Sequence, residues 1–392
     1  MRALELLHDR IRESTPFMHS ARWSALWRCV LALIAAKKLW LTALGRALPA
    51  DSRRKHAIKA VDRLLGNAVL YRERPRIAAA VAGIVVGRRK SVLVLIDTVE
   101  IRHKVIGFVA SIAHQGRSIP IWSTKVSSYR VNAAGCRRFL DGLRRVLPPG
   151  CRPILITDGG FEADWFDYVE SLGWDYIGRV RGQVNFLRGH ERLTCPALHK
   201  MAGRRAKNLG RLQFPAGKPR TRRVVLSKLP ISRHRRIKVR RGTGNDTNYR
   251  HYRKNAHEPL VLTTSLHCRA QQIVDLYAVR MQIEQNFRDL KNHRWGWSLR
   301  HCLSRSKRRI ELLLLIGAIA TLVQHLVGFA GELVNLHLRY QANTVRERRV
   351  LSFFVLGGLL LQNQSRAEVT AAALRKALTR LRSDVSRIGA LA

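Results

Sequence analysis

Apolar residues recur at helical spacing over the first 85 residues. Trp23, Trp27 and Val30 repeat every three or four positions, which predicts an amphipathic helix. A second, shorter helix is predicted over residues 39–48, because Pro49 cannot continue it. This part of the chain is therefore expected to be helical.

A third helix is predicted after residue 50, with Asp51 or Ser52 as its cap and Gly66–Asn67 at its end. Its apolar positions would face a core, and its polar faces carry a run of cations: Arg53, Arg54, Lys55, Lys59 and Arg63. Two short helices followed by a basic one are typical of a DNA-binding helix-turn-helix. An ordinary helical bundle with solvated charges fits the same pattern, and both interpretations stay open.

The pattern changes at Ser91, where the run SVLVLI predicts a buried strand that ends at Asp97. Further strands are predicted over residues 105–113, 119–126, 153–157 and 175–180, with helices over 134–147 and 162–172. The strand 153–157 ends at Asp158. Three consecutive strands followed by alternating helix and strand predict an α/β core with a mixed β-sheet.

Between residues 203 and 254 the chain has eighteen Lys or Arg and one acid, Asp246. Frequent Gly, Pro and β-branched residues there predict an inserted β-rich module with a positive face. A strand over 260–264, a long helix from about 270 to 292 and a final helical region follow. We therefore expect four parts: a helical DNA-binding domain (1–85), a core (86–181 and 259–300), a basic β-rich insertion (182–258) and a helical C-terminal region (301–392).

The charge of the chain indicates a polyanionic partner. Lys and Arg total 72 against 26 Asp and Glu, a formal net charge of +46. Such self-repulsion favours nucleic acid as the counterpart, with an anionic membrane surface as the second candidate. Within the insertion, a dense group of arginines is expected to contact phosphates: Arg233, Arg235, Arg236, Arg240 and Arg241.

No membrane span or metal-binding cysteine motif is predicted. The longest apolar run, residues 312–323, contains Gly317 and Thr321 and is shorter than the about 20 residues a span needs, so it predicts a buried core helix. The six cysteines form no CxxC pair, and Cys195 with His199 lacks a second ligand pair. Reduced, mostly buried cysteines in a cytoplasmic protein are expected.

Asp97 and Asp158 each close an apolar strand in a chain that is poor in acids. Ligand sites in open α/β sheets form at the carboxyl ends of strands. Two carboxylates brought together there repel each other unless a cation lies between them. Alternatively, each aspartate only caps a turn, which the sequence Thr157-Asp158-Gly159-Gly160 would also allow.

The predicted helix over residues 270–292 carries Tyr277, Arg280, Glu284 and Lys291 within roughly a 60° arc of one face. One interpretation is a solvated face with Arg280 and Glu284 as an i,i+4 ion pair. The other is a metal-binding carboxylate flanked by three groups that suit phosphate oxygens.

The spacing Tyr277-x2-Arg280-x3-Glu284-x6-Lys291 resembles the Y-R-E-K signature of bacterial transposases of the insertion sequence 4 family. The sequences VLIDTVE and TDGGFE around the two aspartates are similar to that family, as are the order of the three acids and the insertion before the glutamate. The segments LTALGRALP and IKAVDRLLGN resemble its N-terminal region. The resemblance extends over nearly the whole chain.

The resemblance implies a ribonuclease H-like fold in which Asp97, Asp158 and Glu284 form a triad that holds two Mg²⁺ ions. Mn²⁺ is expected to be able to substitute for Mg²⁺. Oxygen ligands suit such hard cations, and two ions flanking a phosphodiester can activate the nucleophile and stabilise the leaving oxygen. Asp97 would bridge both ions, and the other two acids would hold one each. Tyr277, Arg280 and Lys291 would position the phosphate backbone.

The implied function is DNA transposition: binding of terminal inverted repeats and target DNA, cleavage and strand transfer, in a homodimeric synaptic complex in the bacterial cytoplasm, at the nucleoid. A nuclease without strand transfer and an inactive DNA-binding remnant remain alternatives. The chain departs from the family at one point. Many members have a tryptophan in or near the insertion that stacks on a flipped base, and this chain has no Trp between Trp174 and Trp295.

Overall fold

The computed structural model of the protein describes residues 2–49, 53–102, 105–126, 132–214, 220–228, 258–363 and 369–389. The chain forms two compact units, the first from Met1–Ile154 and Val279–Ala390 and the second from Leu155–Ala278. Strand β4 (Arg152–Thr157) contributes its first half to one unit and its second half to the other.

The sheet of the first unit has the strand order β3-β2-β1-β4. Strands β1 (Ser91–Arg102), β2 (Val105–His114) and β3 (Arg117–Val126) form an antiparallel meander. Strand β2 is buried along nearly its whole length because helices cover both of its faces. On one face Phe108 stacks on Phe139 of α6 (Ala133–Val146), and on the other Gly107 lies against Leu314 of α12 (Lys307–Leu333).

Strand β1 extends beyond the predicted residues 91–96, so the expectation that Asp97 ends it is wrong. Residues 97–102 continue the pairing with β2, where Asp97 lies opposite Val109 and Glu100 opposite Ile106. In this half Thr98 and Glu100 alternate with buried Val99 and Ile101, which is the pattern of a strand covered on one face. Asp97 therefore lies in the middle of β1.

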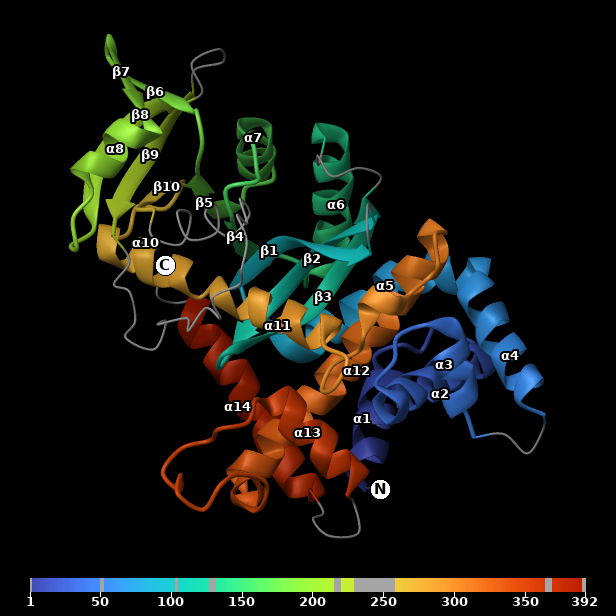
Figure 1. The fold of residues 1–392 in the computed structure, drawn as a ribbon. Helices are drawn as coiled ribbons and strands as arrows, with labels where there is room; N and C mark the ends of the chain where they lie inside the picture. The colour runs from blue at the N-terminus through green and yellow to red at the C-terminus, as the bar shows by residue number, and fades with distance from the viewer. Residues whose placement is uncertain are drawn as a thin grey trace, which may run out of the picture. The chain divides into compact units, whose positions relative to one another are not determined.

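Helix α12 runs through the centre of the helical layer of the first unit (Figure 1). Among the residues that the structure describes, it is the one helix long and apolar enough to cross a membrane, and its apolar window lies wholly inside the protein. This agrees with the predicted core helix. Its fully buried Glu311 is satisfied by Arg74, by the Tyr71 hydroxyl and by the backbone N–H of Lys125. The other helices of this C-terminal part are η2 (Leu299–His301), η3 (Leu336–Tyr340), α13 (Phe353–Gln362) and α14 (Ala371–Gly389).

The N-terminal helices belong to the same unit: α1 (Arg2–Glu13), α2 (Ser20–Ala36), α3 (Leu41–Ala47), α4 (Arg54–Gly66) and α5 (Ala68–Val86). Helices α3 and α4 cross at Gly45, where a Cβ would lie 2.6 Å from the Cα of Ile58, so only glycine fits. Helix α4 ends at the predicted Gly66–Asn67, and Asn67 also caps α5. The predicted caps Asp51 and Ser52 lie outside the described residues, and Arg53 occupies the N-cap position.

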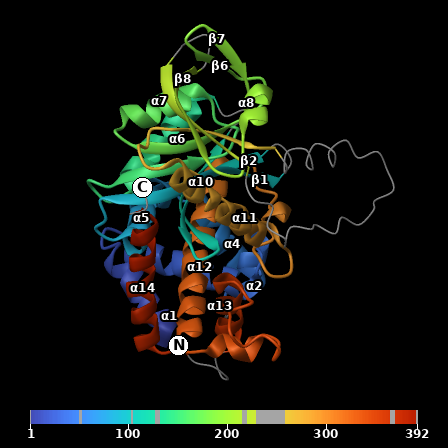
Figure 2. The same ribbon diagram turned by 90° about the vertical axis from the view of Figure 1, so that its left-hand side faces the viewer.

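The second unit is built on the strand order β4-β5-β10-β9-β8-β6-β7. Figure 2 shows its strands β6, β7 and β8. Its strands are β5 (Asp175–Val180), β6 (Asn185–Arg188), β7 (Glu191–Thr194), β8 (Lys207–Phe214), β9 (Arg220–Ser227) and β10 (Leu260–Thr264). Strand β9 pairs directly with β10 in antiparallel register. The described strands of the basic insertion therefore extend the sheet of this unit.

Helices α7 (Ala163–Ser171), α8 (Cys195–Met201) and α10 (Ala270–Ala278) complete the second unit. Phe166 of α7 stacks on Tyr176 of β5, and a Cβ at Gly178 would lie 2.3 Å from the Phe166 ring. Arg222 of β9 is buried and forms ion pairs with Asp167 and Glu170 of α7. The predicted positive face of the insertion therefore does not include Arg222.

The two units together confirm the predicted α/β class. The antiparallel β3-β2-β1 meander followed by β4 and β5, with α6 and α7 between strands, is a ribonuclease H-like core. All six cysteines are free, and five of them are buried, as expected.

Candidate active site

The predicted helix over residues 270–292 is interrupted in the structure. It forms α10 (Ala270–Ala278) and α11 (Met281–Lys291), separated by a turn at Val279–Arg280. The amides of Gln282 and Ile283 bond to carbonyls three residues back, which tightens the backbone here. The four residues of the predicted arc therefore do not share one helix. Tyr277 lies on α10 in the second unit, and Arg280 in the turn with Glu284 and Lys291 on α11 lie in the first.

In the first unit, Arg280 lies between two of the predicted catalytic carboxylates. Its Nη1 is 3.2 Å from Oδ2 of Asp97 on β1, and its Nη2 donates to Oε1 of Glu284 on α11. The Arg280 side chain is 8% exposed, whereas Asp97 and Glu284 are 20% and 36% exposed. The other Asp97 oxygen, Oδ1, accepts the backbone N–H of Thr98 at 2.7 Å. The fold thus brings Asp97 and Glu284, which are 187 residues apart in sequence, to one shared cation.

Arg280 forms the i,i+4 ion pair considered from the sequence and a further contact. It does pair with Glu284 at i,i+4, but it also binds Asp97, which the helical spacing could not indicate. A guanidinium that bridges two carboxylates neutralises their mutual repulsion. Binding of a cation between these two carboxylates is therefore electrostatically favoured.

Lys291, at the last position of α11, lies in the same electrostatic environment. Burial lowers the pKa of its ammonium, and the neighbouring Arg300 lowers it further. Glu100 and Asp97 on β1 act in the opposite direction and favour the charged form. Glu100 was not singled out from the sequence, although its position three residues after Asp97 on the extended β1 places it nearby.

Helix α11 is held in place by buried polar contacts to β3. Arg117 donates to Asp289 at 2.8 Å, and the Asn286 side-chain amide donates to the carbonyl of Ser118 at 3.1 Å. Burial raises the pKa of Asp289, while Arg117 counteracts that effect. Past its end, a Cβ at Gly296 would lie 1.6 Å from the carbonyl oxygen of Asp289, so the following loop can pack closely only with glycine there. These contacts fix the position of Glu284 relative to β1.

In the second unit, Asp158 follows β4 directly, as predicted. The hydroxyl of Tyr277 on α10 donates to its Oδ1 at 3.4 Å, and Nη1 of Arg181 lies 3.8 Å from its Oδ2. A Cβ at Gly159 would lie 2.9 Å from the Arg181 side chain, which explains the small residue after Asp158. Arg181 also approaches Glu258 at 3.9 Å, so Asp158 belongs to a network of charged groups. The sequence did not indicate Arg181 or Glu258.

The remaining predicted residues fall into two groups. Arg53, Arg54, Lys55 and Lys59 are exposed at the start and along the outer face of α4. Arg54 also donates to the carbonyl oxygens of Arg46 and Leu48, where it closes the end of α3. The second group lies outside the described residues: Arg233, Arg235, Arg236, Arg240 and Arg241.

Two further observations concern ligands. Within the part of the chain that the structure describes, no three His, Cys, Asp or Glu side chains are grouped so that they could hold a metal ion. Trp295, four residues after Lys291, is 52% exposed, and the Lys37 ammonium lies 5.6 Å from its ring centroid. It is an exposed aromatic side chain among cations, outside the insertion.

Comparison with known proteins identifies the family to which this chain belongs. No curated protein matches the sequence significantly. A solved piggyBac transposase synaptic complex with hairpin DNA is 11% identical, covering 93% of this chain and 78% of that chain with a TM-score of 0.41, and we draw no conclusion from that distant likeness. The transposase DDE domain family matches residues 102–322, a range that includes Asp158 and Glu284 and begins shortly after Asp97. This match spans more than half of the 392 residues, and the chain therefore belongs to the transposase DDE domain family.

Proposed function

We propose that this protein is an active DNA transposase of the insertion sequence 4 type, which binds transposon ends, cleaves them and joins them to target DNA. The observation that supports this most directly is the pairing of Asp97 and Glu284 with one guanidinium. Membership of the transposase DDE domain family supports the same conclusion. The third acid of the proposed triad is Asp158.

The donor set fits a divalent metal. Asp97 and Glu284 offer carboxylate oxygens, the ligands that Mg²⁺ prefers. Asp158, which the Tyr277 hydroxyl and Arg181 contact, offers a third carboxylate at 28% exposure. Two Mg²⁺ ions, or Mn²⁺ in their place, would supply a polarised nucleophile and a stabilised leaving oxygen. Asp97, Asp158 and Glu284 are the residues that would hold them.

The chain's own cations would orient the DNA strand. Arg280 has a planar fork that matches phosphate as well as carboxylate, so it can exchange its carboxylate partners for a phosphate when metal binds them. Lys291 is a compact cation whose charged form Glu100 and Asp97 favour, against the effect of burial on its pKa. Tyr277 would hold the Asp158 carboxylate through its hydroxyl and lie beside the backbone of the strand. Positioning of this kind lowers the barrier by fixing the reacting groups before the reaction.

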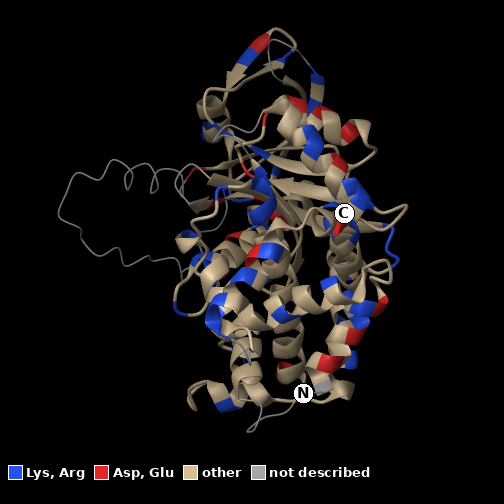
Figure 3. Ribbon diagram, turned by 90° about the vertical axis from the view of Figure 1, so that its right-hand side faces the viewer, with Lys and Arg blue, Asp and Glu red and all other residues tan. Residues whose placement is uncertain are grey.

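DNA binding would draw on the exposed cations around these groups. Lys and Arg greatly outnumber acids along the ribbon (Figure 3). The exposed residues of α4 would contact the terminal inverted repeats as part of a helix-turn-helix, and the basic segment that contains Arg233 and Arg241 would contact phosphates without sequence preference. Synapsis of two ends would require a homodimer, with the helical C-terminal region as a candidate interface.

The test is strand cleavage by conservative variants of the triad. Asp97→Asn, Asp158→Asn and Glu284→Gln should each abolish Mg²⁺-dependent cleavage of DNA that carries the element's own ends, while binding to the same DNA persists. Asp275→Asn, an exposed acid on α10, serves as the matched control and should cleave normally. Substantial cleavage by any triad variant would remove that residue from the metal site. Cleavage without joining to target DNA by the wild type would replace the transposase proposal with a nuclease.

A further inference from the structure

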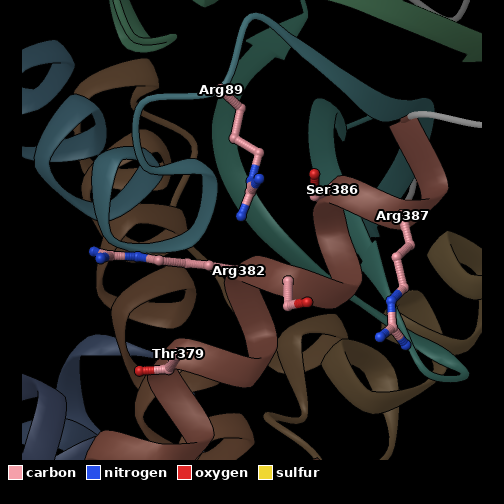
Figure 4. A pocket seen from close by; sticks show the side chains of 6 residues that line it. Arg89, Thr379, Arg382, Ser386 and Arg387 are labelled. Carbon is pink, nitrogen blue, oxygen red and sulfur yellow. The ribbon is translucent and has the colours of Figure 1, made fainter.

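A cavity of about 460 Å³ lies in the first unit between α14 and the turn that precedes β1. It is lined by three arginines and three hydroxyl groups: Arg89, Arg382, Arg387, Thr379, Ser383 and Ser386. Figure 4 shows Arg89 pointing from the turn toward the face of α14, with Arg382 and Arg387 extending to either side. No carboxylate lines it, so its polar groups are cations and hydroxyls.

Among the residues that the structure describes, the cations of this cleft have no anionic partners. Within the described residues, no Asp or Glu lies within 4.0 Å of the nitrogens of Arg89, Arg382 or Arg387. Nε of Arg89 is buried and has no hydrogen-bond partner among them. The nearby acid of α14, Asp384, already accepts from Gln115 at 2.7 Å and pairs with His114 at 3.3 Å.

The cleft is also preformed. Nε of Arg382 donates to the carbonyl of Ile84 at 3.0 Å, which fixes this side chain against the end of α5. Gly87 has a positive φ of 66° and reverses the chain beside Arg382, and the turn then presents three consecutive cations, Arg88, Arg89 and Lys90. Burial lowers the pKa of Arg382, and the charges of Arg10 and Arg89 lower it further, because the cluster repels itself. An anion placed there would relieve that repulsion.

We infer that this cleft is a phosphate-binding site that holds a backbone phosphate of bound DNA, away from the site of cleavage. Fork-shaped guanidinium groups and hydroxyls are the donors that recognise phosphate oxygens. Asp97 lies six residues along β1 from Ser91, or roughly 20 Å at about 3.3 Å per residue, so the cleft is a separate contact in the same unit. This inference rests on the proposed function, because the proposed function makes DNA the source of the bound phosphate.

The test compares the salt dependence of binding to a random-sequence duplex for three proteins. Arg89→Gln with Arg387→Gln removes two cleft cations and leaves the bonded Arg382 in place. Arg375→Gln with Arg380→Gln removes the same charge from exposed positions of α14 that do not line the cleft. Each phosphate contact contributes about 0.9 to the log–log slope. The cleft variant should lose about 0.9 of slope or more, and the control should keep the wild-type slope.

A second measurement separates DNA from a free anion. Sodium phosphate should raise the melting temperature of the wild type more than sodium chloride at equal ionic strength, and the cleft variant should lose that difference. Ser386→Asp, which places a carboxylate in the cleft, should reproduce the loss of slope if the double arginine variant folds poorly. Phosphate protection with an unchanged DNA slope would assign the cleft to a small anion and overturn the inference. An equal loss of slope in the cleft variant and in the control would also overturn it. A wild type that does not bind DNA would instead refute the proposed function itself.

Discussion

Replacing Arg280 tests the candidate active site most directly. Arg280→Ala removes the guanidinium that bridges Asp97 and Glu284, and with it the charge that offsets the mutual repulsion of the two carboxylates. Removing one partner of a buried ion pair costs about 3–5 kcal/mol, whereas a surface pair contributes about 0–1 kcal/mol. Because Arg280 is buried while Glu284 is 36% exposed, we expect a loss of roughly 2–3 kcal/mol in the free energy of unfolding without metal.

Mg²⁺ should reverse part of this loss. In the wild type, a metal ion must compete with Arg280 for Asp97 and Glu284. In Arg280→Ala the same carboxylates have lost the competing guanidinium, so Mg²⁺ should stabilise the variant more than the wild type. Urea unfolding with EDTA and with Mg²⁺ measures both free energies. Arg280→Lys keeps the charge without the planar fork and should have intermediate stability.

Catalysis should respond differently from stability. If Arg280 orients the scissile phosphate, Arg280→Ala should slow single-turnover cleavage of pre-bound ends at least about tenfold, or some 1.4 kcal/mol of barrier. Lys291→Ala should show the same defect, although Lys291 has no i,i+4 pairing with Glu284 to lose. Arg288→Ala is the matched control, because Arg288 is exposed on the same helix and its side chain donates to Gln285. Wild-type stability together with wild-type cleavage in Arg280→Ala would refute this role.

Three further predictions concern the fold and the DNA interface. Burial lowers the pKa of His114 to about 4. Because the unfolded chain then binds more protons than the folded protein between about pH 4 and 6.5, the free energy of unfolding should fall by about 2 kcal/mol from pH 7 to pH 5. Equal urea midpoints at the two pH values would contradict this. Gly357→Ala places a Cβ 1.8 Å from the backbone oxygen of Gln324 and should cost about 3 kcal/mol, whereas Gly83→Ala, which meets no atom within 4 Å, should stabilise α5 by roughly 0.5–1 kcal/mol. Chemical denaturation of both variants checks the sign of each effect. The last prediction neutralises five arginines of the basic insertion together: Arg233, Arg235, Arg236, Arg240 and Arg241. This should flatten the salt dependence of DNA binding by close to one unit of log–log slope for each true phosphate contact. An unchanged slope would mean that these arginines face solvent.

The sequence by itself determined most of the secondary structure, because those signals are local. The strands β5 and β10 have the predicted bounds, and α6 and β4 agree within one residue, since β-branched runs and helical spacing need no distant partner. The position of Asp158 after β4 and the burial of α12 followed from the same local patterns. The fold class was predictable for this reason.

Tertiary structure decided what each charged side chain contacts. Strand β1 continues past Asp97 because β2 supplies partners, and the helix breaks at Arg280 although neither proline nor glycine occurs there. Arg222 lies in a dense run of cations but is buried against acids of α7, whereas Arg89 and Arg382, which are 293 residues apart, line one cleft. A charge has no intrinsic periodicity that identifies its partner. Its role depends on which distant groups the fold brings within a few ångströms, where Coulomb energy and desolvation are largest.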